Sequence, residues 1–251
     1  MPESLTQDEN VESRHPFYSK IVSFAPRSTR LKDRQAKVWD ELAPKYVVTP
    51  ERAIARASIS PSERFDAAAT FGRDAKFIVE IGSGQGECAE NAAGQNPAVN
   101  FLAIEVYVPG IASTLVKIRR SELENLRVLQ ADAAEAFDTY FPAESIDEVW
   151  TFFPDPWHKS RHNKRRLVQL GFATSVAAAM KPGGVWRLAT DWLDYAEQMQ
   201  EVLAASPYFV RAEVQERFEG RVLTSFEKKG IAKDRIITDH TYIRNDVAVA
   251  N

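Results

Sequence analysis

The sequence Phe-Ile-Val-Glu-Ile-Gly-Ser-Gly-Gln-Gly at residues 77–86 joins an apolar run to a glycine-rich turn. The run at 77–81 is typical of a strand that is covered on both faces. Glycines after such a strand let the chain turn sharply and let a ligand approach the backbone, and the helix that follows offers unpaired N–H groups. The segment therefore predicts a strand–turn–helix unit with a ligand crevice at its turn.

The chain beyond this unit repeats the same alternation of apolar runs and helical patterns, which is typical of βαβ units around a parallel sheet. Four further parallel strands are expected, at residues 101–105, 128–132, 149–153 and 185–189. Two late runs, 209–214 and 241–244, predict an antiparallel pair at the sheet edge. The predicted fold is α/β, with a mostly parallel seven-stranded sheet and helices on both faces.

Length and composition are those of an ordinary globular protein. The chain has 251 residues, of which 44% are hydrophobic and 27% charged, so one α/β domain with an N-terminal extension is the economical division. Residues 1–13 contain four acids and no Lys or Arg, which predicts a disordered acidic tail. Residues 14–70 include a basic cluster at 27–37 and are expected to form an extension packed on the main domain, 71–251.

Several protein classes are unlikely on composition. Cys88 is the single cysteine, and the four histidines are scattered, so no zinc-site spacing exists and no metal is expected. The first residues lack a basic stretch followed by an apolar one, and the chain has no window of about 18 apolar residues. The sequence predicts a cytoplasmic protein without a membrane segment.

Three carboxylates follow consecutive predicted strands: Glu80, Glu105 and Asp132. The carboxyl ends of parallel strands meet at one edge of the sheet, so these acids are expected to converge there. Each acid alone could equally be an ordinary strand-end or helix-capping residue, and the glycine turn alone could be purely structural. Together, however, they favour a ligand that carries positive charge.

The nature of the turn favours one cofactor over another. The pyrophosphate of a dinucleotide would be repelled by Glu80, and the G-x-G-x-G spacing at 82–86 differs from the G-x-G-x-x-G of dinucleotide sites. S-adenosylmethionine instead has a sulfonium and an ammonium, a ribose diol that suits Glu105 and an adenine amino group that suits Asp132. The sequence therefore predicts an S-adenosylmethionine site.

The fourth predicted strand ends in Phe-Phe-Pro-Asp-Pro-Trp at 152–157. Pro154 and Pro156 fix their own φ angles and keep the residues before them out of the helical region, so Asp155 is expected on a stiff, extended turn. Stiff positioning suits a reaction centre. The alternative is a proline-rich strand exit in which Asp155 caps the next helix.

A basic strip follows at 159–166, where five of eight residues are Lys or Arg and none is acidic. Such a run is often only a solvated face. Beside Asp155, and with the basic cluster at 27–37, it favours a polyanionic substrate, with RNA as the leading candidate.

Two later segments are expected to complete the pocket. Asp191 follows the fifth strand, where it either meets the substrate or caps the helix that contains Leu193. Thr-Ser-Phe-Glu at 224–227 puts a hydroxyl and a carboxylate on a loop near the carboxyl end of the sheet. The alternative for this segment is an ordinary surface loop.

These motifs together resemble those of the bacterial tRNA (guanine-N7)-methyltransferase family. They are E-I-G-S-G-Q-G (80–86), I-E-V-Y-V-P-G (104–110), F-F-P-D-P-W-H-K-S-R-H-N-K-R-R (152–166), A-T-D-W (189–192) and T-S-F-E (224–227). The resemblance covers roughly residues 20–245. It implies a Rossmann-like class I fold, with 71–251 as the methyltransferase domain, and methyl transfer from S-adenosylmethionine to N7 of guanosine 46 in the tRNA variable loop.

The resemblance also implies roles for individual residues. The cofactor would be held by Glu80, Gly82, Gly84, Gly86, Glu105, Asp132 and Asp155, with Asp155 also the catalytic residue. The substrate would be held by Lys159, Asp191, Thr224, Ser225, Phe226 and Glu227. RNA would be contacted by Arg161, His162, Asn163, Lys164, Arg165 and Arg166. The chain departs from the family pattern at His158, where the family often has Pro, and at Ser225, where it often has Lys.

Guanine itself suggests the mechanism. Its N7 lone pair is already nucleophilic, so transfer needs alignment more than a general base, and Asp155 is expected to orient the base and stabilise the positive charge that grows on it. The other readings are a methyltransferase of another RNA or of a small anionic substrate, a non-catalytic RNA-binding protein on this fold, and a nicotinamide-dependent oxidoreductase. The expected partner is tRNA, and the protein would be a monomer or a homodimer.

Overall fold

The computed structural model describes residues 30–52, 58–218 and 220–249. The predicted acidic tail at 1–13 and Arg27 of the basic cluster lie outside these residues. In the described part of the chain, eight strands form one sheet in the order β1-β4-β3-β2-β5-β6-β8-β7. Their bounds are β1 Val47–Val48, β2 Phe77–Ile81, β3 Asn100–Ile104, β4 Leu126–Leu129, β5 Ile146–Phe152, β6 Met180–Thr190, β7 Phe209–Arg211 and β8 Thr238–Arg244.

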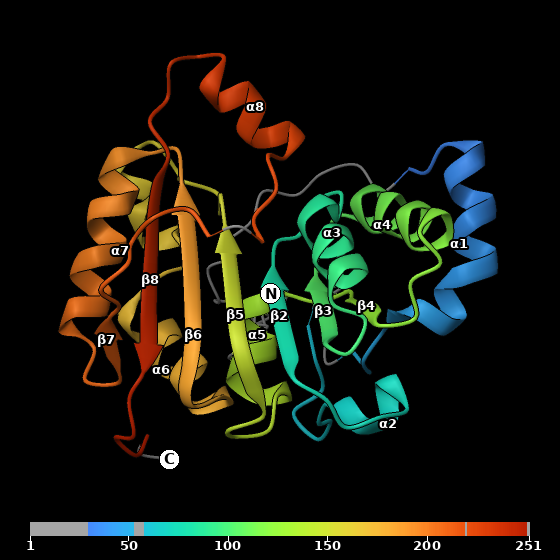
Figure 1. Cartoon of the computed structure of the whole chain (residues 1–251), viewed down its shortest axis with the longest axis horizontal. Coiled ribbons are helices and arrows are strands. Elements are labelled where there is room, and N and C mark those ends of the chain that lie inside the picture. The colour runs from blue at the N-terminus through green and yellow to red at the C-terminus, as the bar shows by residue number, and fades with distance from the viewer. Residues whose placement is uncertain (1–29, 53–57, 219, 250–251) are drawn as a thin grey trace, which may run out of the picture.

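The sheet is mostly parallel, as predicted. All neighbouring pairs from β1 to β6 are parallel, whereas β8 is antiparallel to both β6 and β7. Figure 1 shows the arrowhead of β8 pointing opposite to those of β5 and β6. The eighth strand was not predicted: β1 is a two-residue strand within the segment predicted to form an N-terminal extension, and Val47 pairs with Val128.

Helices cover both faces of the sheet. They are α1 Asp33–Tyr46, α2 Ala67–Phe71, α3 Glu87–Gln95, α4 Val108–Arg120, α5 Ala133–Glu135, α6 Leu170–Ala179, α7 Leu193–Ala205 and α8 Ser225–Ile231. Successive side chains of β2 point to opposite faces of the sheet and belong to two cores. Ile78 lies in the core formed with α1, α3 and α4, whereas Phe77 and Val79 lie in the core that includes α6 and α7. Side chains buried on both faces explain why β2 is apolar at every position except Glu80.

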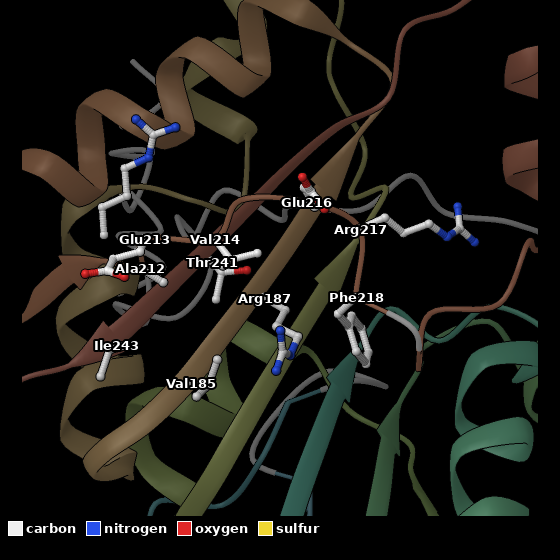
Figure 2. Close-up of a pocket in the computed structure, with 11 residues that line it drawn as sticks. Val185, Arg187, Ala212, Glu213, Val214, Glu216, Arg217, Phe218, Thr241 and Ile243 are labelled. Atoms are coloured by element: carbon white, nitrogen blue, oxygen red, sulfur yellow. The ribbon is translucent and has the colours of Figure 1, made fainter.

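The element boundaries differ from the predicted ones in an informative way. The strand at 77–81 is confirmed, whereas the strand expected at 128–132 ends at Leu129 because Asp132 already caps α5. The strand expected at 209–214 ends at Arg211. Figure 2 shows the chain after Arg211 crossing the face of the sheet, where it lines an open groove of about 620 Å³ together with Arg187 of β6.

Candidate active site

The glycine turn after β2 depends on glycine at three positions. Gly82, Gly84 and Gly86 have φ angles of +66°, +58° and +72°, a left-handed conformation that residues with a Cβ adopt at a cost. A Cβ at Gly86 would also lie 2.4 Å from Oγ1 of Thr114 in α4. The turn therefore connects β2 to α3 through a backbone conformation that substitution of these glycines would strain.

Glu105, directly after β3, holds this turn. One carboxylate oxygen accepts a hydrogen bond from the backbone nitrogen of Gly84 at 2.8 Å. The other accepts from the backbone nitrogens of Val106 and Tyr107, each at 2.8 Å. Bonds from N–H groups to an ionised carboxylate are stronger than those between neutral groups. Glu105 thus connects the carboxyl ends of β2 and β3, as the predicted convergence requires.

Glu80 is the most unusual acid at this edge. It is 7% exposed, and its Oε2 atom is buried without a hydrogen-bond partner. Burial raises the pKa of Glu80 to about 8; the N–H of Ala89 opposes the rise, and the charge of Glu105 adds to it. A buried carboxyl oxygen without a partner is rare in native proteins. A cationic ligand group at this position would satisfy it and favour its ionised form.

Asp132 lies at the same edge, after β4. Its carboxylate accepts a hydrogen bond from the backbone nitrogen of Ala134 at 2.8 Å and caps α5. The helix-capping role that was weighed against cofactor binding is therefore present. A carboxylate has further acceptor positions, so capping and ligand binding are compatible.

The Pro-Asp-Pro-Trp turn follows β5 at the neighbouring strand end. Phe153 and Trp157 have φ angles of +52° and +48°, so Phe153 is outside the right-handed helical region as predicted but left-handed rather than extended. The backbone nitrogen of Phe153 donates to the carbonyl of Ala189 at the end of β6, at 2.7 Å. Asp155 is half-buried in the middle of this turn, beside the edge that carries Glu80.

The basic strip forms a 3-10 helix at Ser160–Arg165. Lys159, Arg161 and Lys164 are exposed, and the guanidinium carbon of Arg165 lies 3.9 Å from the centroid of the Trp157 ring. Slight desolvation and the charges of the neighbouring cations lower the pKa of His162. The five Lys and Arg residues of the strip are thus not equivalent. Three face solvent, Arg165 stacks on the turn that carries Asp155, and the fifth, Arg166, is buried.

Arg166 is buried, unlike the exposed cations of the strip. Its side chain is 1% exposed and pairs with Asp194 of α7 at 2.7 Å. Its guanidinium donors are used inside the protein, by Pro156, Asp194 and Gln198. Arg166 therefore differs from the exposed cations of the strip.

Thr224 and its neighbours begin helix α8 rather than forming the expected loop. Oγ1 of Thr224 accepts from the backbone nitrogen of Glu227 at 3.1 Å and caps the helix. Ser225 donates from its backbone nitrogen and its hydroxyl to Glu87 of α3, at 2.8 and 2.6 Å. In Figure 1, α8 stands beyond the carboxyl ends of the strands. The loop expected in both readings of this segment is therefore wrong, because Ser225–Ile231 form a helix.

The other two residues of this motif have opposite environments. Phe226 is 52% exposed, and its ring centroid lies 5.4 Å from that of Phe153. Glu227 is almost fully buried, where it pairs with Arg217 and lies 2.8 Å from Nη1 of Arg221. The motif therefore gives the edge one exposed aromatic ring and one carboxylate held by two arginines.

Asp191 does not cap α7. That helix has Trp192 at its N-cap without a side-chain capping bond, and the Asp191 carboxylate instead pairs with Arg235 at 2.6 Å. Asp191 is buried at the end of β6, so it lies at the edge of the sheet where the substrate role would place it.

Sequence reasoning missed the arginines that hold these acids. Arg221 is fully buried and pairs with Asp239 of β8 at 2.8 Å as well as with Glu227. Arg217 and Arg235 complete the set. Arg217 and Arg221 lie close in the sequence to the motif at 224–227, which is a signal that the sequence offered. Arg235 offered no such signal, because its partner Asp191 lies 44 residues away in the chain.

Within the described part of the chain, no helix is long and apolar enough to span a membrane. Nor do the described His, Cys, Asp and Glu side chains form a group of three or more that could hold a metal ion.

Comparison with known proteins identifies the family. A family model described as putative methyltransferase matches residues 74–240. The chain is 43% identical to a tRNA (guanine-N(7)-)-methyltransferase of Arthrobacter sp. (strain FB24), over 91% of this chain and 88% of that protein. It is 38% identical to the protein of the same name from Dechloromonas aromatica (strain RCB), over 97% and 98% of the two chains.

A solved structure supports the fold alone. The crystal structure of the 16S rRNA methyltransferase KamB matches with a TM-score of 0.54 and 19% identity, over 77% of this chain and 100% of that chain. The fold is thus the α/β, Rossmann-like fold of class I methyltransferases. With a family model over most of its length and relatives this similar, the chain belongs to the bacterial tRNA (guanine-N7)-methyltransferase family.

Proposed function

We propose that this protein transfers a methyl group from S-adenosylmethionine to N7 of guanosine 46 in the variable loop of tRNA. The observation that carries the proposal is the carboxyl edge of the sheet. There the buried, unpartnered oxygen of Glu80 lies on the strand next to the Asp155 turn, and exposed cations follow that turn. The names of the relatives supply the reaction.

The residues at this edge fit the donor. Glu80 would pair with its positively charged groups, and the turn at Gly82, Gly84 and Gly86 would let it approach the backbone. Glu105 and Asp132 would accept from its hydroxyl and amino groups. When bound, the donor supplies an electrophilic methyl group on a sulfonium. The raised pKa of Glu80 supports a cationic partner, because that partner would stabilise the ionised carboxylate.

Asp155 is the proposed catalytic residue, and it would also contact the donor. Because N7 of guanine carries its own lone pair, Asp155 need not remove a proton. It would orient the base and stabilise the positive charge that develops on the ring. The left-handed residues on either side of the turn and the bond from Phe153 to Ala189 support a fixed position for this carboxylate.

The tRNA would lie across the edge and the basic strip. Phosphate contacts are proposed for Arg161, His162, Asn163, Lys164 and Arg165. Lys159, Asp191, Thr224, Ser225, Phe226 and Glu227 are proposed to hold the substrate nucleotide. A nucleotide in a loop costs less to extrude from its stack than one in a helix. The exposed ring of Phe226 supports a stacking contact with such a base.

The remaining organisation is proposed on the same basis. Residues 71–251 would form the methyltransferase domain and 14–70 an extension; the packing of α1 against α4 and the pairing of β1 with β4 support this division. A protein that modifies tRNA would act in the cytoplasm, as a monomer or a homodimer.

One assay tests donor, acceptor and ring atom together. The protein is incubated with methyl-labelled S-adenosylmethionine and unmodified tRNA, and the RNA is digested to nucleosides. We expect the label in 7-methylguanosine, and a G46→A tRNA should remain unlabelled. Label in another nucleoside would identify a different RNA methyltransferase, and label in small molecules only would favour a small anionic substrate.

A further inference from the structure

The main chain directly after Asp155 is bound to a buried arginine. Nε of Arg166 donates a hydrogen bond to the carbonyl oxygen of Pro156 at 2.8 Å. This carbonyl belongs to the turn that carries Asp155, and the arginine that reaches it comes from ten residues later in the chain. The position of the turn is therefore set from inside the protein.

The other nitrogens of Arg166 bind the start of helix α7. Nη2 pairs with Oδ2 of Asp194 at 2.7 Å, and Nη1 donates to Oε1 of Gln198 at 2.8 Å. The guanidinium carbon lies 4.8 Å from the centroid of the Tyr195 ring. A guanidinium is planar and presents its donors in a rigid fork. Arg166 thus fixes the carbonyl of Pro156 relative to the first turns of α7.

The turn needs such support because its backbone is strained. Phe153 and Trp157 both have positive φ angles, and residues with a Cβ keep this conformation only where the surrounding structure imposes it. At the first end, the bond from Phe153 to Ala189 supplies the restraint. At the second end, the bond from Arg166 to Pro156 does so.

We propose that Arg166 is a positioning residue, which holds the Asp155 carboxylate in place for the reacting base, and that it does not contact RNA. The proposal rests on the proposed function for the role of Asp155. It separates Arg166 from its neighbour Lys164, which is exposed. Displacing a reacting group by about 1 Å can cost about 10²-fold in rate, so losing this support should slow the reaction rather than weaken tRNA binding.

The variant Arg166→Lys distinguishes positioning from phosphate binding. Lysine keeps the positive charge that a phosphate contact needs. Its single ammonium cannot serve Pro156, Asp194 and Gln198 in the geometry of a guanidinium. We expect kcat to fall by about 10- to 100-fold, while KM for tRNA and its salt dependence stay at the wild-type values. A raised KM with an unchanged kcat would identify a phosphate contact and overturn the proposal.

A second variant, Asp194→Asn, tests the proposal even where Arg166→Lys does not fold. Asp194 is half-exposed, so Asp194→Asn should fold, yet it loses the charge that orients the Arg166 guanidinium. We expect kcat to fall by several-fold, with unchanged KM and an unchanged thermal unfolding midpoint. The matched control is Glu197→Gln, which removes the same charge from an exposed position of α7 and should behave as wild type. Equal kcat in Asp194→Asn and Glu197→Gln would contradict the proposal.

A measurement without turnover separates this proposal from the proposed function. The indole ¹⁵N–¹H resonance of Trp157, assigned with Trp157→Phe, reports on the turn directly. We expect Arg166→Lys to shift or broaden it while the resonances of Trp39 and Trp186 stay in place. An unchanged Trp157 resonance would refute the positioning role even in an active enzyme. A wild-type protein that methylates no tRNA would refute the proposed function, and the resonance would still decide the role of Arg166.

Discussion

Oε2 of Glu105 lies 2.8 Å from the backbone nitrogen of Gly84, so the acid after one strand fixes the glycine turn after its neighbour. This relationship gives Glu105 a structural task in the protein without ligand, in addition to the donor contact proposed for it. Replacing Glu105 should therefore affect both the stability of the turn and the affinity for the donor.

For Glu105→Gln we expect both effects in one variant. Glutamine keeps the shape and one acceptor oxygen but loses the charge that strengthens three backbone hydrogen bonds. The free energy of unfolding should fall by about 1 kcal/mol. Loss of a charged contact to the donor, about 1.4 kcal/mol, corresponds to tenfold weaker binding. Denaturant unfolding measures the loss of stability, and calorimetric titration with S-adenosylmethionine measures the loss of affinity. If Glu105→Gln bound the donor as tightly as the wild type, Glu105 would not contact the donor.

The raised pKa of Glu80 makes a prediction about pH. Burial raises this pKa from 4.5 to about 8, so between these values the folded protein binds a proton that the unfolded chain has released. Stability should therefore fall as pH rises from 4.5 to 8. In Glu80→Gln that contribution to the slope should be absent. Unfolding series over this pH range, with the two proteins in parallel, measure the difference; identical slopes would contradict it.

Glu80 should also release its proton when the donor binds. At pH 7 the carboxyl is mostly protonated in the free protein, and a cationic partner favours the ionised form. Calorimetric titrations in two buffers of different ionisation enthalpy should therefore show proton release for the wild type. No release is expected for Glu80→Gln. Equal heats in both buffers for the wild type would mean that the donor does not meet this carboxyl.

Features of this structure could be predicted from the sequence where they depend on local patterns, but not where the interacting residues lie far apart in the chain. The strand at 77–81 and the convergence of Glu80 and Glu105 depend on local patterns and on the rule for parallel sheets. β2 and β3 are indeed parallel neighbours. Burial of Arg166 depends on Asp194, which lies 28 residues further along the chain. No local pattern distinguishes that arginine from its exposed neighbours.

Two other differences have the same origin. Asp191 was weighed as a cap for the next helix, but its partner is Arg235, 44 residues away. The strand β1 has only two residues and exists because Val47 and Val48 meet the edge of β4. A two-residue run carries no periodicity, so pairing with a distant strand decides whether it is a strand at all.

The buried pair of Arg221 and Glu227 should contribute strongly to stability. Arg221→Met leaves the buried Glu227 and the half-buried Asp239 without this partner. Breaking a buried pair on one side costs about 3–5 kcal/mol. Denaturant unfolding measures the loss. The matched control is Arg119→Met, which breaks an exposed pair with Glu41 and should lower the free energy of unfolding far less. Similar losses in the two variants would show that the pairs of Arg221 contribute no more than an exposed ion pair.

Lys164 should contribute to tRNA binding through its charge alone. For Lys164→Ala we expect weaker tRNA binding and a salt dependence shallower by about one unit of slope, because one fewer counterion is released. Filter binding between low and moderate salt measures this. The control is Lys181→Ala, which removes the same charge near the start of β6, at the end of the sheet away from the proposed site. There the lysine pairs with Asp147, so its loss should leave the salt slope unchanged. Parallel slopes for Lys164→Ala and the wild type would remove Lys164 from the interface.

The role proposed for Asp155 is to position a guanine and to stabilise the positive charge that develops on its ring as N7 is methylated. Single-turnover methylation of unmodified tRNA by wild type and Asp155→Asn, at saturating donor and tRNA with 7-methylguanosine quantified after digestion, tests it most directly. We expect 7-methylguanosine from the wild type and a rate about 10²-fold lower in Asp155→Asn. An equal rate in the variant, or a different methylated nucleoside from the wild type, would contradict it.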